Sequence, residues 1–161
     1  MSAEAVKTFL QQHGLLENYR QFASSSATVE LAAQAAGCEP GRIAKTLSFV
    51  TKNGPVVIVV MGTARVDNRK YKEFFHEKAR FPHGEEVEKL TGHPVGGVCP
   101  FALNPGVKVY LDESLKAFDP VYPAAGASNN AVQISLAELE RVTGGEWIDV
   151  CKTPEAAGET A

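Results

Sequence analysis

The chain of 161 residues is 44% apolar and 22% charged, a composition typical of a globular protein, and its length allows one domain with a substantial core. It contains no apolar run near the ~20 residues that span a bilayer, and its N-terminus does not resemble a signal peptide, so we expect a cytoplasmic protein without a membrane partner. A formal net charge of −3 argues against a generic basic nucleic-acid-binding protein, and no DNA partner is expected.

Helix signals recur along the whole chain. Residues 1–14 show an amphipathic pattern, and Thr28 and Asp67 suit the first position of later helices. Ser135 and Glu138 fit a capping box, and glycines follow several of these segments, as is common where helices end. We therefore predict helices over residues 1–14, 28–37, 67–75, 84–92 and 135–144.

Apolar runs bounded by turn residues predict the strands. The run at 55–61 is continuously apolar, which indicates burial on both faces, and the turn KNG joins it to the preceding run LSFV. The polar segment GASNN separates two later runs. We predict strands over residues 47–50, 55–61, 107–112, 119–124, 131–136 and 147–151.

This order of elements favours the α+β class. Strands joined by short turns, with separate helices between them, predict a single domain in which helices surround a mixed β-sheet or partly closed barrel. A regular doubly wound fold would need stricter alternation of strand and helix. We assign residues 1–152 to this domain and expect residues 153–161 to form a disordered tail.

The cysteines and histidines do not form a recognisable framework. Cys38, Cys99 and Cys151 are far apart and odd in number, so a disulfide scaffold is not expected. The chain has no CxxC or HxxxH spacing, and we expect neither a metal site nor a cofactor.

The stretch TGHPVGGVCPFAL offers two interpretations. Cys99 could be a nucleophile served by His93, but a reactive thiol needs a lowered pKa and a base within hydrogen-bond reach, which closeness in sequence does not provide. Alternatively, Gly96 and Gly97 let a ligand approach the backbone while Pro100 fixes the end of the loop. Main-chain N–H groups would then face an ester carbonyl, and the thiol would be incidental.

Lys45 and a polar turn are further candidates. Lys45 precedes the predicted strand at 47–50, where a lysine either extends its ammonium into solvent or holds a phosphate or carbonyl oxygen at a pocket rim. Gly126, Ser128 and Asn129 lie in the turn of YPAAGASNN, which is either a simple connection or a space beside a strand end.

Positive charge is concentrated in one segment. The run RVDNRKYKEFFHEKAR contains six basic residues against three acids, and it is either a solvated helix face or a patch that faces phosphates. Its basic residues are Arg65, Arg69, Lys70, Lys72, Lys78 and Arg80.

Four motifs taken in order, RIAKTLSF, TGHPVGGVCPFAL, LDESLKAFD and VYPAAGASNNAV, resemble the YbaK/EbsC family. Its members are free-standing aminoacyl-tRNA deacylases related to the editing domain of bacterial prolyl-tRNA synthetase. The resemblance extends from about residue 20 to residue 151. It implies a trans-editing hydrolase that removes a small, wrongly attached amino acid, with mischarged proline tRNA as the expected substrate. The expected partners are aminoacylated tRNA and, transiently, prolyl-tRNA synthetase. The alternative is a non-catalytic module that binds a small ligand or a synthetase.

The resemblance also assigns residues. The functional lysine of the family falls on Lys45, and its Gly-x-x-x-Pro loop falls on 96–100, where Cys99 replaces the serine of many relatives. Because the ester is activated, water, placement and an oxyanion partner suffice, and no Ser-His-Asp set is required. The expected substrate-binding residues are Thr46, Gly96, Gly97, Val98, Cys99, Pro100, Gly126 and Asn129. The expected tRNA-binding residues are Arg65, Arg69, Lys70 and Lys72. The identity of the removed amino acid stays open.

Overall fold

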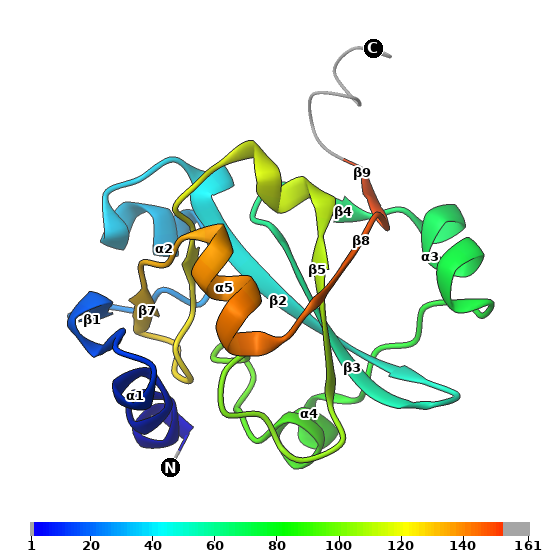
Figure 1. Ribbon diagram of the computed structural model, residues 1–161, viewed down its shortest axis with the longest axis horizontal. Helices are drawn as coiled ribbons and strands as arrows, with labels where there is room; N and C mark the ends of the chain where they lie inside the picture. Colours follow the sequence, from blue (N-terminus) through cyan, green and yellow to red (C-terminus); the bar gives the residue numbers. More distant parts are fainter. Residues whose placement is uncertain (1, 153–161) are drawn as a thin grey trace.

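A mixed five-stranded sheet, ordered β6-β2-β3-β5-β8, forms the centre of the computed structural model, which describes residues 2–152 (Figure 1). The predicted tail at 153–161 lies outside the described residues. The strands are β1 (Tyr19–Gln21), β2 (Ile43–Thr51), β3 (Gly54–Met61), β4 (Arg65–Val66), β5 (Lys108–Asp112), β6 (Tyr122–Pro123), β7 (Asn130–Val132), β8 (Glu146–Ile148) and β9 (Cys151–Lys152). The helices are α1 (Ser2–Gln12), α2 (Val29–Ala36), α3 (Asn68–Phe75), α4 (Gly84–Thr91) and α5 (Leu136–Thr143), with 3₁₀ turns η1 (Leu16–Asn18), η2 (Pro40–Arg42) and η3 (Glu113–Ala117).

Parallel and antiparallel pairs are combined in this sheet. β2 and β3 form an antiparallel hairpin, whereas β3–β5, β5–β8 and β2–β6 are parallel. Two short antiparallel pairs, β1–β7 and β4–β9, extend the strand structure beyond the central sheet. The α+β class with a mixed, partly closed sheet is therefore confirmed.

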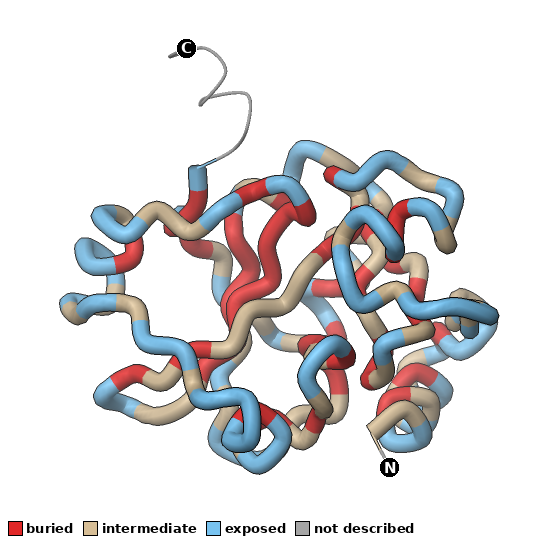
Figure 2. The backbone as a smooth tube through the Cα atoms, turned by 180° about the vertical axis from the view of Figure 1, so that it is seen from behind, coloured by how far each residue is buried: buried red, intermediate tan, exposed pale blue. Residues whose placement is uncertain are grey.

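The central strand β3 is apolar throughout because both of its faces are covered. On one face, Val59 packs with Leu10 of α1 and Leu139 of α5. On the other, Ile58 packs with Tyr71 of α3. Figure 2 shows the buried strands at the centre of the molecule and exposed segments around them. Apolar residues on both faces of one strand thus create two cores, which fix β2 and β3 in place.

The predicted helix starts are confirmed by their hydrogen bonds. Thr28 Oγ1 accepts from the N–H of the third helical residue, and the Asp67 and Ser135 side chains accept in the same way. The capping box at Ser135 is only half formed, because the Glu138 carboxylate pairs with Arg141 instead. Glycines in the left-handed conformation end three of the helices: Gly37, Gly92 and Gly144.

Several strand boundaries differ from prediction. The strand expected at 131–136 stops at Val132, since Ser135 already caps α5. The strand expected at 147–151 is divided, because Val150 N donates to the buried Asp112 Oδ1 at 2.8 Å and turns the chain toward β4. Within the described residues, no helix is long and apolar enough to cross a membrane.

Candidate active site beside the edge of β2

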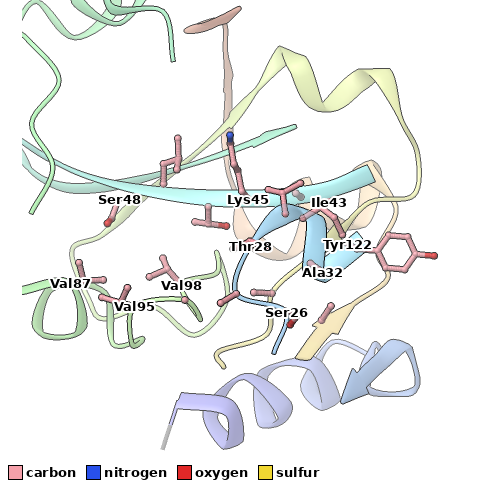
Figure 3. Close-up of a pocket in the computed structure, with 18 of the residues that line it drawn as sticks. Ser26, Thr28, Ala32, Ile43, Lys45, Ser48, Val87, Val95, Val98 and Tyr122 are labelled. Carbon is pink, nitrogen blue, oxygen red and sulfur yellow. The ribbon is translucent and has the colours of Figure 1, made fainter. Parts of the chain in front are cut away.

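A pocket of about 480 Å³ lies along one edge of β2, within the ~300–1,000 Å³ usual for ligand sites. It extends from Val87, Val95 and Ser48 at one end to Ile43, Ala32 and Tyr122 at the other (Figure 3). Lys45 is the one charged side chain among the described residues that line it. The lining residues are Ser26, Ala27, Thr28, Val29, Ala32, Ile43, Ala44, Lys45, Thr46, Leu47, Ser48, Phe81, Pro82, Val87, Val95, Gly96, Val98, Tyr122, Ala124, Asn130 and Ala131.

The edge of β2 offers main-chain groups to this pocket. β6 pairs only with Ile43 and Ala44, so among the described residues no strand pairs with that edge from Lys45 onward. Val50 N donates outward to Arg80 O at 2.8 Å. Because the direction of main-chain groups repeats every two residues, the N–H and C=O of Thr46 and Ser48 also face outward.

Thr46 adds a side-chain group to the same edge. Its hydroxyl oxygen is buried and has no hydrogen-bond partner among the described residues. A buried hydroxyl without a partner costs free energy, about 1–3 kcal/mol, which a bound polar ligand would recover. The lining position of Thr46 makes it a candidate ligand contact.

The glycine loop lies opposite this edge. Gly96 has φ +90°, which favours glycine, and both Gly96 and Val98 line the pocket. Gly97 N donates to Pro94 O at 2.9 Å, so this N–H already has a partner inside the loop. The N–H groups of Gly96 and Val98 make no hydrogen bond to another described residue. These two, rather than Gly97, are the donors available to a ligand.

Lys45 is partly buried, and its ammonium already has one acceptor. Nζ donates to Ala64 O at 2.6 Å, and the side chain extends from β2 away from Val95 and Val98 (Figure 3). Burial is the main cause that lowers the pKa of Lys45, and the nearby Arg65 charge adds to it. Since an ammonium has three donors, two remain for a ligand at the rim of the pocket.

Cys99 lies behind the loop rather than in the pocket. It is fully buried, and burial raises the pKa of its thiol to about 12. His93 Nε2 is 3.5 Å from Cys99 Sγ, but the same nitrogen is only 2.7 Å from Phe101 O. Nε2 therefore carries the proton and donates it to this carbonyl, so it is not a free base for the thiol. Pro100 is also buried, outside the lining.

The sequence of the chain also matches a known family model. The family model for the aminoacyl-tRNA editing domain matches residues 23–142, which include both β2 and the glycine loop. The chain belongs to the aminoacyl-tRNA editing domain family. The resemblance to YbaK/EbsC proteins that the motifs indicated is confirmed.

Individual relatives cover almost the whole editing domain. The chain is 44% identical over 154 residues to the uncharacterised protein YwhH of Bacillus subtilis (strain 168), covering 94% of this chain and 98% of YwhH. It is 28% identical over 145 residues to an Enterococcus faecalis protein named "Putative Cys-tRNA(Pro)/Cys-tRNA(Cys) deacylase EbsC", covering 88% of each. A solved structure described as "a putative trans-editing enzyme for prolyl tRNA synthetase" superposes with a TM-score of 0.85 at 33% identity, over 94% of this chain and 97% of that one.

In this editing domain, the predicted glycine turn is a packing position. A Cβ on Gly126, which has φ +97°, would meet Ser2 Oγ at 2.8 Å, and a Cβ on Gly97 would meet Ala127 N at 2.7 Å. Gly126 is therefore a point of close approach between the turn and α1, and Gly97 one between the loop and the turn. Neither lines the pocket.

Asn130, rather than the predicted Asn129, lines the pocket of the editing domain. Its Oδ1 accepts from Ala125 N at 3.0 Å and Ala127 N at 3.3 Å, and its Nδ2 donates to Ala125 O and to the Tyr19 hydroxyl. The buried amide thus holds the turn in shape. Two adjacent asparagines give no local signal for this choice, since the pairing of β7 with β1 decides which one faces inward.

The predicted tRNA-binding residues lie on β4 and α3, away from the pocket lining. Arg69 pairs with Glu73 at 3.2 Å, and Lys70 Nζ pairs with Asp149 at 3.0 Å. The hydrogen bond that Lys70 donates to Asp149 raises the pKa of Lys70, whose charge is thereby compensated within the protein. The other two residues of the predicted set form no ion pair with another described residue: Arg65 and Lys72.

Proposed function

We propose that the protein hydrolyses the ester that joins a wrongly attached amino acid to tRNA. The observation that carries this proposal is the pocket between two sets of main-chain donors. The unpaired edge of β2 lies on one side. Gly96 and Val98, whose N–H groups make no hydrogen bond to another described residue, line the other. Such groups suit an ester carbonyl, whose oxygen gains negative charge in the transition state.

The chemistry needs no protein nucleophile. Water attacks the carbonyl carbon, the new C–O bond forms, and the tetrahedral intermediate places its negative oxygen against the main-chain donors. The attacking water releases one proton to solvent as the new bond forms. The bond to the ribose oxygen then breaks, that oxygen takes up a proton from solvent, and the free amino acid and the uncharged tRNA leave. The buried Cys99 has no part in these steps, because its raised thiol pKa keeps it protonated at neutral pH.

Lys45 anchors the nucleotide part of the substrate. Its two remaining donors suit a phosphate or ribose oxygen of the terminal nucleotide, while the third stays on Ala64 O. The ammonium also makes the rim of the pocket beside β2 positive, which favours a polyanion over a free amino-acid ester.

The other end of the pocket suits a small, neutral amino acid. Ala32, Ile43 and Ala131 are buried there, and no charged side chain is among them. Mischarged proline tRNA is the proposed substrate, and a transient association with prolyl-tRNA synthetase is the proposed partnership. Both are supported by the similarity to the structure described as a putative trans-editing enzyme for prolyl tRNA synthetase and by the resemblance of the motifs.

The test is deacylation of a panel of tRNAs. Proline tRNA charged with alanine, cysteine, serine or threonine is incubated with the protein, with correctly charged proline tRNA and an alanine tRNA charged with alanine as controls. We expect turnover of at least one mischarged proline tRNA above the spontaneous rate, and no turnover of the correct pair. Tight binding without turnover of any member would favour a non-catalytic module instead.

A further inference from the structure

An aromatic ring stands exposed at the open end of the pocket. Phe81 is 61% exposed and Val95 is 67% exposed, the two highest values among the large apolar side chains of the described residues, and both line the pocket. Single exposed apolar residues are ordinary on protein surfaces. Two of them on one pocket rim indicate a surface that a ligand covers.

The ring of Phe81 is supported from beneath. Its centroid lies 4.8 Å from the ring of the buried Phe49, which in turn lies 5.1 Å from the ring of Tyr71. Arg80, the preceding residue, accepts a hydrogen bond from Val50 N at 2.8 Å and so ties the segment to β2. One side of the Phe81 ring is therefore held against the core, and the exposed part is free for a flat ligand.

The aromatic residue at the opposite end is less available. Tyr122 also lines the pocket, but the guanidinium of Arg20 lies over its ring, 5.7 Å from the centroid. At the same end of the pocket lie the buried side chains of Ala32 and Ile43 (Figure 3). A flat heterocycle therefore fits the end with Phe81, and a small side chain fits the end with Tyr122.

We propose that Phe81 is the stacking platform for the nucleobase of the terminal nucleotide that carries the amino acid. The proposal rests on the proposed function, because it assumes that an aminoacylated nucleotide enters the pocket. Bases stack on aromatic side chains through their π-faces, and a platform already fixed in position loses little entropy on binding. Stacking at this end places the ribose beside Ser48 and Thr46, where the main-chain groups of β2 face the pocket.

The first experiment compares Phe81→Ala, Phe81→Leu and Phe81→Trp in deacylation kinetics. Phe74→Ala is the matched control, because Phe74 is also a partly exposed phenylalanine, at 39%, and does not line the pocket. We expect Phe81→Ala and Phe81→Leu to lower kcat/KM roughly five- to 150-fold, mainly through KM, while Phe81→Trp and Phe74→Ala retain the wild-type value. On a tRNA whose terminal nucleotide lacks its base, Phe81→Ala and wild type should be equal. Wild-type kinetics in Phe81→Leu, or the same loss on the abasic substrate, would overturn the proposal.

The second experiment separates the platform from the reaction. 5′-AMP is titrated into wild type and Phe81→Ala while NMR follows the aromatic resonances, and thermal melts confirm that both are folded. We expect AMP to shift the Phe81 and Phe49 signals in wild type and to bind more weakly to Phe81→Ala. Absence of any shift at millimolar AMP would refute the platform even if the protein deacylates tRNA. A protein that binds AMP through Phe81 but hydrolyses no aminoacyl-tRNA would refute the proposed function alone.

Discussion

Replacing Lys45 with alanine should reduce deacylation much more than stability. A hydrogen bond between a charged donor and the substrate contributes ~1.5–3 kcal/mol, so its loss should lower kcat/KM roughly ten- to 150-fold. The substitution also removes the 2.6 Å bond from Nζ to Ala64 O. One intramolecular hydrogen bond contributes ~0.5–1.5 kcal/mol to folding, which corresponds to a fall in Tm of about 2–4 °C per kcal/mol for a chain of this size.

The assay is single-turnover hydrolysis of mischarged proline tRNA by wild type, Lys45→Ala and Lys45→Arg, with a thermal melt of each protein. Lys45→Arg should recover only part of the rate, because a planar guanidinium replaces a compact ammonium. Burial lowers the pKa of Lys45, so its charge is lost at a lower pH than that of a free lysine. The ratio of the wild-type rate to the Lys45→Ala rate should therefore shrink as the pH rises through the lowered pKa of Lys45. An unchanged rate in a folded Lys45→Ala protein would refute the anchoring role, and a lost rate with a collapsed melt would show a structural role.

Four further variants test the loop, the core and the predicted tRNA contacts. Cys99→Ser should keep most of the activity, and iodoacetamide should leave the folded protein active, because the thiol is buried and its pKa is raised. A loss of activity beyond about a hundredfold, or ~2.7 kcal/mol, would instead support Cys99 as the nucleophile. Gly97→Ala should lower Tm, because its Cβ would meet the backbone of the neighbouring turn at 2.7 Å. The shift of the loop should displace the N–H groups of Gly96 and Val98 and slow turnover by ~10²–10³; normal kinetics would mean that the loop does not shape the site. Tyr71→Phe should leave activity unchanged and stability equal or higher in denaturant unfolding, since the buried hydroxyl has no hydrogen-bond partner in the described part of the chain; a clear loss of stability would contradict this. Changing Arg65 and Lys72 together to alanine should raise KM and reduce its salt dependence. The effect should be larger than that of changing the ion-paired Arg69 and Lys70 to alanine, and equal effects would contradict a direct contact with tRNA.

The helix ends and the central strand could be predicted from the sequence because their causes are local. The Thr28 side chain caps a helix whose first N–H groups lie within three residues of it, and Gly37 ends that helix through its own left-handed conformation. The apolar run of β3 likewise required burial on both faces wherever the strand lay. The order of motifs also indicated the family, since each motif is a contiguous stretch.

The short strand pairs could not be predicted in this way. β1 and β4 have two or three residues each, and their partners β7 and β9 lie far along the chain. No local periodicity exists in segments of that length. The division of the last predicted strand has the same origin, because Asp112 binds Val150 across 38 positions of sequence.

For the site, the sequence by itself determined which residue types are present: a lysine before a strand, a glycine loop and a polar turn. Only the tertiary structure decided their contacts. It placed the Lys45 ammonium on Ala64 O, buried Cys99 behind the loop, and brought Asn130 rather than Asn129 to the pocket. It also brought Phe81 to the pocket rim on top of Phe49. The physical reason is that these contacts join segments separated by tens of residues, and their geometry depends on how the two faces of one sheet are packed, which no contiguous stretch of sequence specifies.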